Sequence, residues 1–202
     1  MIRPRLQFPH ALPTLALAAA LGLAATSAAN PAPPAATAPP ATTAPARPAW
    51  TDPTGIKRFA VVEAGFYRGS RPSAEGILAL KARGVRTIVS LRKDDAERAR
   101  VLAAGMDYVE LPMVATPFGA PVPTEAQVNA FLAVVGDPAR RPVFVHCKHG
   151  RDRTGVMVAL WRVARGGWPV DAAIAEMEDR GMGPQYLNYR RFIRRWTVPT
   201  GA

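Results

Sequence analysis

Short apolar runs alternate with longer amphipathic stretches from residue 51 to the end of the chain. Short apolar runs are typical of buried strands, and apolar positions at helical spacing are typical of helices that pack on a sheet. The runs predict strands at residues 57–62, 66–68, 85–91, 107–111 and 142–145. The longer stretches predict helices at residues 72–84, 95–104, 124–135, 154–165, 170–180 and 185–196. The order of these elements predicts an α/β fold with a central, mainly parallel sheet flanked by helices on both faces.

Local signals support this organisation. Thr124 and Gln127 have the spacing of a capping box, so a helix should begin there. In the last predicted helix the large apolar residues share one face, which we expect to pack into the core: Tyr186, Tyr189, Ile193 and Trp196. Residues 51–202 are enough for a single domain with one core. Ligands of parallel sheets bind beyond the carboxyl ends of the strands, so the segment after residue 145 is the place where a site is expected.

The first 29 residues have the three parts of a secretory signal. Arg3 and Arg5 precede an apolar stretch at residues 11–25, and small residues end the segment at residue 29. Pro13 and the polar residues near its ends make this stretch a weak membrane span, so we expect cleavage, no stable membrane span after cleavage, and export to the periplasm. Residues 30–50 hold Pro, Ala and Thr with little apolar bulk and should form a disordered linker. The predicted domain therefore covers residues 51–202.

Residues 146–155 read HCKHGRDRTG and contain the single cysteine of the chain, Cys147, six positions before Arg153. This glycine-containing turn lies between a predicted strand and a predicted helix. In such a turn, backbone N–H groups point inward and the helix dipole adds partial positive charge, which makes a concave site for an anion. The same surroundings lower the pKa of a cysteine from about 8.5 to roughly 3.5–7.5. The pattern therefore predicts a phosphate-binding loop that carries an ionised nucleophile.

The neighbours of Cys147 fit this chemistry. The planar fork of Arg153 can hold two phosphoryl oxygens at once. The Thr154 hydroxyl can donate to the sulfur and help it leave from a phosphocysteine. The other loop residues are expected to bind substrate, with His146 fixing the loop through internal hydrogen bonds: His146, Lys148, His149, Gly150 and Arg151. One cysteine and two nearby histidines lack the ligand spacing of a zinc site, so we expect neither a metal nor a cofactor.

The residues His146, Cys147, Arg153 and Thr154 match the pattern His-Cys-x5-Arg-Thr/Ser, and the chain resembles the cysteine-based protein tyrosine and dual-specificity phosphatases. Within that superfamily it is most similar to small exported bacterial tyrosine phosphatases, over about residues 59–183. The similar segments are residues 67–72, 93–95, 111–112 and 146–150. The resemblance implies a dual-specificity phosphatase-like fold and hydrolysis of phosphate monoesters through a phosphocysteine intermediate, with phosphotyrosine on proteins as the substrate.

Two observations keep other functions open. A related resemblance, to plant and fungal phosphatases that act on inositol pyrophosphates, rests on the same loop and on Pro117-Phe118, and it keeps inositol polyphosphates or pyrophosphates as alternative substrates. The family also uses an aspartic acid on the preceding loop as general acid, whereas residues 112–123 contain no acidic residue. A phosphate-binding module with weak turnover is therefore the non-enzymatic alternative.

Substitutes for the missing acid exist elsewhere in the chain. Asp152 is the first candidate, and its alternative role is to balance the charge of Arg151. The other candidates are Glu125, Asp107 and Glu110. Loss of a general acid costs about 10²–10⁴ in rate. Phenols, with a pKa near 10, leave more readily than alkyl alcohols, so phosphotyrosine or a pyrophosphate is favoured over phosphoserine.

The charge of the chain favours anionic partners. Lys and Arg number 26 against 15 Asp and Glu, a formal net charge of +11. Such a field attracts a phosphorylated protein or another anionic phosphate substrate. Nucleic acid is not expected as a partner because the chain has no aromatic-and-basic binding motif. The sequence gives no indication of the oligomeric state.

Overall fold

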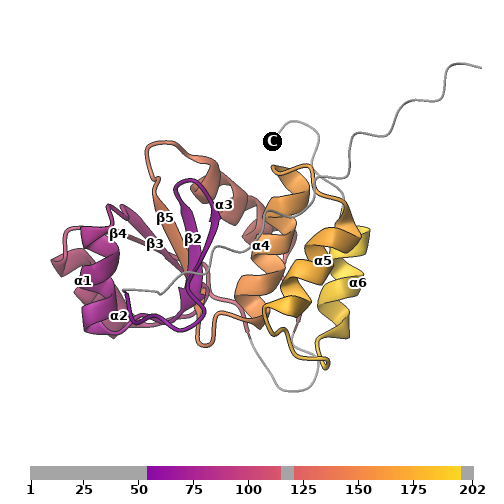
Figure 1. Ribbon diagram of the computed structural model, residues 1–202, viewed down its shortest axis with the longest axis horizontal. Helices are drawn as coiled ribbons and strands as arrows, with labels where there is room; N and C mark the ends of the chain where they lie inside the picture. The colour runs from indigo at the N-terminus through magenta and orange to yellow at the C-terminus, as the bar shows by residue number, and fades with distance from the viewer. Residues whose placement is uncertain (1–53, 115–120, 197–202) are drawn as a thin grey trace, which may run out of the picture. The chain divides into compact units, whose positions relative to one another are not determined.

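The computed structural model describes residues 54–114 and 121–196, which contain a five-stranded sheet with helices on both faces (Figure 1). The strands lie in the order β1-β2-β5-β3-β4. Their bounds are β1 (Ala60–Glu63), β2 (Phe66–Ser70), β3 (Thr87–Ser90), β4 (Asp107–Glu110) and β5 (Val143–Cys147). The β1/β2 pair is antiparallel, and every other pair is parallel. The predicted fold class is therefore confirmed.

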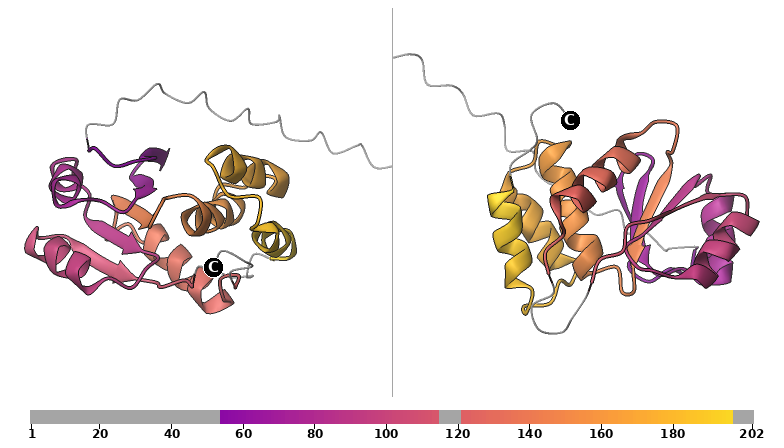
Figure 2. Two further views of the ribbon diagram at one scale, coloured as in Figure 1. Left: turned by 90° about the horizontal axis from the view of Figure 1, so that it is seen from below. Right: turned by 180° about the vertical axis from the view of Figure 1, so that it is seen from behind.

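The helices are divided between the two faces of the sheet. Their bounds are α1 (Ala74–Ala82), α2 (Asp95–Ala103), α3 (Glu125–Gly136), α4 (Asp152–Ala164), α5 (Val170–Asp179) and α6 (Leu187–Arg195). Helices α1 and α2 pack on one face, and α3 and α4 pack on the other, with α5 and α6 outside α4 (Figure 2). The predicted capping box at Thr124 and Gln127 begins α3.

The side chains of β5 alternate between the two faces, as the pleat of a strand requires. Val143, Val145 and Cys147 point into the larger apolar cluster with α3 and α4, whereas Phe144 belongs to the smaller cluster with α1 and α2. His146 follows Phe144 on that second face, and the two rings stack with centroids 5.8 Å apart. The nucleophile candidate and its neighbouring histidine therefore face opposite layers of the domain.

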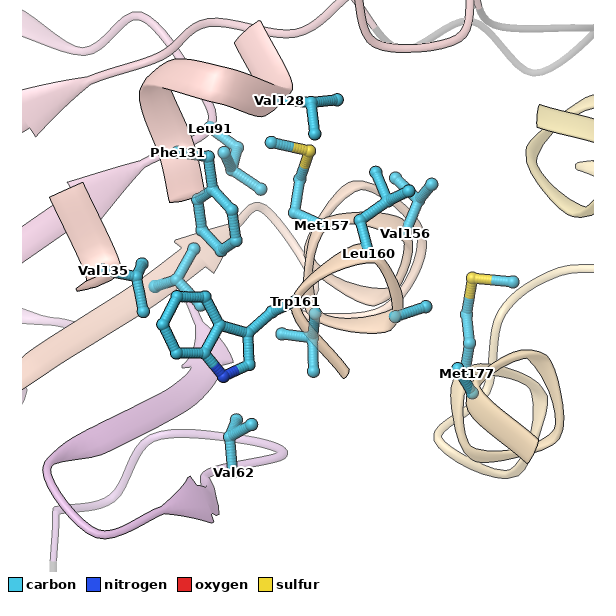
Figure 3. Packing of buried hydrophobic residues seen from close by; sticks show 14 of the residues in the cluster. Val62, Leu91, Val128, Phe131, Val135, Val156, Met157, Leu160, Trp161 and Met177 are labelled. Carbon is cyan, nitrogen blue, oxygen red and sulfur yellow. The ribbon is translucent and has the colours of Figure 1, made fainter. Parts of the chain in front are cut away.

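The larger cluster is built around α4, which is buried along most of its length. Trp161 lies near Phe131 and Val135 of α3 and Val62 of β1 (Figure 3). Its ring is also 5.6 Å from that of Phe66 of β2, in an edge-on arrangement. The expected core face of α6 is confirmed at Tyr186, Tyr189 and Ile193, which are all buried. Close packing on both sides holds α4, and the loop that precedes it, in a fixed position relative to the sheet.

The main differences from the sequence-based elements are at strand ends. The first strand begins at Ala60 instead of residue 57, because residues 57–58 form a turn in which Arg58 has φ 56°. Strand β5 continues to Cys147, two residues past the apolar run. The predicted signal peptide (residues 1–29), the linker (30–50) and Pro117-Phe118 lie outside the described residues. Within the described ranges, no helix combines the length and apolar character that crossing a membrane requires.

Candidate active site

The loop between β5 and α4 emerges at the carboxyl ends of three parallel strands. In the sheet register, His146 of β5 is level with Gly69 of β2 and Ser90 of β3, and Cys147 is level with Ser70. The segment from Cys147 to Arg153, which we call the phosphate loop, turns back from β5 into the first turn of α4. Anions bind where backbone N–H groups of such a turn and a helix N-terminus converge.

The sulfur of Cys147 is buried inside this loop. The residue is 3% exposed, and the Gly150 N–H donates to Sγ over 3.3 Å. Burial acts to raise the pKa of Cys147. The Thr154 hydroxyl and N–H, the charge of Arg153 and the His149 N–H outweigh burial, so the pKa of this thiol lies below its ordinary value. The geometry therefore favours a thiolate, as the sequence predicts.

Thr154 and Arg153 flank the sulfur from the first turn of α4. The Thr154 hydroxyl is completely buried and has no hydrogen-bond partner in the described part of the chain, and its nearness to the sulfur acts to lower the pKa of Cys147. Arg153 Nη1 donates to the backbone carbonyls of Leu91, over 3.2 Å, and Met113, over 3.1 Å. These bonds connect the phosphate loop to the segments that follow β3 and β4. They involve only Nη1 of a guanidinium group that has five N–H donors.

A buried arginine of the neighbouring strand β2 forms a hydrogen bond with the loop. Arg68 of β2 is 1% exposed, and its Nη2 donates to the Gly150 carbonyl over 2.9 Å. Burial, followed by the charge of Arg180, lowers the pKa of Arg68 to about 10, while Glu176 and Cys147 act to raise it. Arg68 therefore stays cationic at neutral pH and attracts the Cys147 thiolate. Sequence reasoning did not assign Arg68 to the site. The available signal was an arginine inside an otherwise buried strand.

The rim of the loop is cationic and exposed. Lys148 and His149 are exposed, and Arg151 is half-buried. Arg58 Nη1 donates to the His149 carbonyl over 3.4 Å, and the Arg71 N–H donates to the Lys148 carbonyl over 3.4 Å. Slight burial, followed by the charges of Arg151, Lys148 and Arg58, lowers the pKa of His149. The rim is thus suited to attract an anion before it reaches the sulfur.

His146 differs from the rim residues because it is completely buried. Its Nδ1 lies 3.2 Å from the Cys147 carbonyl, and its Nε2 lies 3.4 Å from Oε1 of Glu97, another completely buried side chain. The side chain of His146 thus faces α2, behind the phosphate loop. This position fits the predicted internal hydrogen-bonding role.

The residues of this site lie in a segment of the chain that matches a known protein family. The family described as "DSP-PTPase phosphatase fused to NAD+ kinase" matches residues 54–195 of the chain. The chain belongs to this dual-specificity phosphatase family. The phosphatase domain is 36% identical over 120 residues to the dual specificity protein phosphatase TpbA of Pseudomonas aeruginosa, covering 59% of this chain and 52% of that protein. The chain therefore spans about half the length of this curated relative.

A solved structure of TpbA and one further relative agree with this assignment. The crystal structure of P. aeruginosa TpbA in complex with phosphotyrosine superposes with a TM-score of 0.60 at 29% identity, covering 73% of this chain and 90% of that one. Inositol diphosphatase DSP3 of Arabidopsis thaliana is 27% identical over 124 residues, covering 59% of this chain and 60% of that protein. The likeness to TpbA is consistent with the predicted dual-specificity phosphatase-like fold.

The acidic residues of the phosphatase domain that could serve as general acid have identifiable contacts. Asp152 Oδ1 accepts the Gly183 N–H over 2.9 Å, and Oδ2 lies 4.0 Å from Arg151 Nε. This contact joins the first turn of α4 to the segment between α5 and α6, a structural role that the sequence left open beside the catalytic one.

The other candidate acids lie on the surface or are held in ion pairs. Glu125 and Asp107 are exposed. Glu110 accepts bonds from the Asp94 N–H and Arg98, which lower its pKa although burial alone acts to raise it. A carboxyl held ionised in this way is poorly suited to give up a proton at neutral pH.

The described residues contain no group of three or more His, Cys, Asp or Glu that could hold a metal ion.

Proposed function

We propose that this domain hydrolyses phosphate monoesters in two steps, with Cys147 as the nucleophile. The observation that supports this most directly is a buried sulfur with a lowered pKa, bonded by a loop N–H at the carboxyl end of a central parallel strand. A lowered pKa makes the sulfur easier to ionise than an ordinary thiol, and the loop around it is the kind of place where an anion binds.

In the first step, the Cys147 sulfur attacks phosphorus and the bond to the leaving oxygen breaks. Loop N–H groups and the Arg153 guanidinium hold the other phosphoryl oxygens, whose charge spreads in the transition state. In the second step, water attacks phosphorus, the sulfur–phosphorus bond breaks, and inorganic phosphate leaves. The Thr154 hydroxyl donates to the departing thiolate and makes it a better leaving group.

Asp152 is the proposed source of the proton for the leaving oxygen. Its Oδ1 is bonded to Gly183, so Oδ2 is the atom that would carry the proton. The rim residues Lys148, His149 and Arg151 are proposed to attract and bind the substrate, and Gly150 and His146 to shape the loop.

Phosphotyrosine on proteins is the proposed substrate. TpbA, named a dual specificity protein phosphatase, has been crystallised with phosphotyrosine, and its sequence is 36% identical to this chain over 120 residues. Inositol polyphosphates or pyrophosphates are the second candidate. The exposed cations around the loop and the likeness to an inositol diphosphatase favour this alternative.

We also propose a domain organisation and location. Residues 1–29 would act as a signal peptide, residues 30–50 as a linker and residues 51–202 as the phosphatase domain in the periplasm. The support is the arrangement of basic, apolar and small residues at the start of the chain. Sequencing the amino terminus of the protein from a periplasmic extract tests this: a start after residue 29 is expected, and an intact first residue contradicts cleavage.

A turnover assay on the purified chain tests the enzyme proposal. We expect phosphate release from an aryl phosphate that vanadate inhibits, that a chelator leaves unchanged, and that Cys147→Ser abolishes. Tight binding of a phosphopeptide without release supports the phosphate-binding module instead. A comparison of a phosphotyrosyl peptide, a phosphoseryl peptide and an inositol pyrophosphate then decides the substrate class.

A further inference from the structure

Behind the phosphate loop lie two buried ionisable side chains that take no part in the proton and phosphoryl transfers proposed above. Glu97 is in the first turn of α2, and His146 precedes the nucleophile on β5. Both are 0% exposed. Glu97 Oε2 accepts the Tyr108 hydroxyl over 3.2 Å, and Glu97 Oε1 lies 3.4 Å from His146 Nε2. Burying a carboxyl group next to an imidazole destabilises the folded state unless a hydrogen bond joins the two groups.

The hydrogen-bond partners of His146 and Glu97 determine which of their atoms carry hydrogen. The Cys147 carbonyl can accept and cannot donate, so His146 Nδ1, 3.2 Å away, carries a hydrogen. Tyr108 donates to Glu97 Oε2. His146 Nε2 and Glu97 Oε1 therefore face each other, and neither atom has a hydrogen-bond partner elsewhere in the described ranges. Two facing lone pairs in a dry site repel, whereas one hydrogen between them satisfies both atoms.

We propose that Glu97 and His146 share one buried proton, and that this proton holds the first peptide of the phosphate loop in its binding orientation. Glu97 is then a positioning residue that acts on the nucleophile through His146. The expected effect of Glu97 on phosphate hydrolysis rests on the proposed function, whereas its expected effect on alkylation of the Cys147 thiol does not.

The connection to the loop runs through the Cys147 carbonyl. In a trans peptide the C=O and the following N–H point in opposite directions. A carbonyl held on the side of His146 therefore turns the Lys148 N–H to the opposite side. The backbone of His146 is fixed as well, because its carbonyl accepts the Leu91 N–H over 2.9 Å. Because the backbone of His146 is held in place, a change in the protonation of Glu97 should pass through the imidazole to the Cys147 carbonyl and the loop.

Charged groups around the pair come from several elements. Arg71 follows β2, Arg92 and Asp94 follow β3, and Tyr108 lies on β4. Asp94 is 2.8 Å from Arg71 and 3.9 Å from Arg92, so these charges partly cancel near the pair. Burial raises the pKa of Glu97 to about 7 and lowers that of His146 to about 4, so the shared proton belongs to Glu97. Above about pH 7 that proton leaves, and a buried carboxylate faces the imidazole lone pair.

The test measures the alkylation rate of Cys147 by iodoacetamide from pH 5 to 9 in the full chain, without substrate. In the wild type, ionisation of Glu97 adds a negative charge near the thiolate, and we expect a second inflection near pH 7 with a rate change of at least about twofold. Glu97→Gln keeps a donor for His146 and an acceptor for Tyr108 but cannot ionise. Its profile should lack the inflection, with a rate at pH 6 within about twofold of wild type.

Tyr108→Phe is the matched variant. It removes the bond that helps to ionise Glu97, so the inflection should move to higher pH. It also keeps the test decisive if Glu97→Gln does not fold. An inflection that persists in Glu97→Gln, or stays in place in Tyr108→Phe, overturns the proposal. The pH profile of aryl phosphate hydrolysis should show the same differences, and a normal alkylation pattern without any hydrolysis would contradict the enzyme proposal alone.

Discussion

Gly150 of the phosphate loop lies directly against the backbone of Gly69 in β2. A β-carbon on Gly150 would stand 2.5 Å from both the carbonyl carbon and the carbonyl oxygen of Gly69. The φ angle of Gly150 is 69°, in the left-handed region that favours glycine. The loop can therefore settle on the neighbouring strand because this position has no side chain.

Gly150→Ala should consequently displace the loop. We expect a loss of unfolding free energy of about 2 kcal/mol or more, from strain and the clash with backbone, and a rise in the pKa of Cys147 because the Gly150 N–H leaves the sulfur. Urea unfolding and pH-dependent alkylation measure the two effects. Gly84→Ala is the control: its φ is 82°, but nothing lies within 4 Å of the added carbon. It should cost about 1 kcal/mol and leave the thiol unchanged.

Arg68→Met removes the buried charge beneath the loop while keeping most of the side-chain volume. The Gly150 carbonyl loses its 2.9 Å donor, which should cost about 1–3 kcal/mol of unfolding free energy. The pKa of Cys147 should rise, because the attraction between the thiolate and the guanidinium is lost. Thiol alkylation at pH 6 measures this as a slower rate. Arg68→Lys keeps the charge and should show a smaller rise; equal rates in all three proteins would contradict the electrostatic role.

Asp152→Asn separates the two roles of this side chain. The asparagine oxygen can still accept the Gly183 N–H, so stability should change by less than about 1 kcal/mol. If Asp152 donates the proton to the leaving group, hydrolysis of alkyl phosphates should fall by about 10²–10⁴, and that of aryl phosphates by less. Steady-state kinetics on one substrate of each kind provide the measurement. Unchanged turnover of both would show that Asp152 is structural.

The stability of the protein should depend on Glu97 in a defined pH window. The pKa of Glu97 rises from an ordinary 4.5 to about 7 on folding, so between these values the folded state retains a proton that the unfolded chain releases. Its contribution to stability is therefore complete below about pH 4.5 and is lost as pH rises to about 7. Glu97→Gln has no such loss and should gain on the order of 2 kcal/mol relative to wild type between pH 5 and 8.

Urea unfolding of both proteins at pH 5 and pH 8 provides the measurement. The pKa of His146 is lowered to about 4, which has the opposite effect and adds stability as pH rises from about 4 to its ordinary 6.5. Because both proteins contain His146, the difference between them isolates Glu97. A difference that does not change with pH would show that Glu97 keeps an ordinary pKa in the folded protein.

The position of the phosphate loop between a strand and a helix could be predicted from the sequence because its residues are contiguous. Cys147, Arg153 and Thr154 lie within one turn, and glycine, strand and helix signals on either side fix its shape. The fold class followed from the alternation of elements in the same way. Strand ends were less certain, because residues 57–59 have strand-like composition but contain a turn at Arg58.

The supporting residues were missed because they come from distant parts of the chain. Arg68 contacts Gly150 across 82 positions, and no local pattern indicates that pairing. Glu97 is buried on α2 one turn before Val101, also buried, so helical spacing could have placed this carboxyl group on the inner face. Its partner His146 becomes evident only when alternate residues of β5 are assigned to opposite layers.

The central position of β5 in the sheet affects which part of the domain unfolds locally. Strands β2 and β3 bond to β5 on both sides, whereas β1 and β4 form the margins of the sheet. Marginal strands can fray while the middle of a sheet stays intact, so amide hydrogens of residues 143–147 should exchange with deuterium only through global unfolding. The sulfur of Cys147 therefore lies on the strand that should open last, and partial fraying under mild heat should leave its surroundings in place.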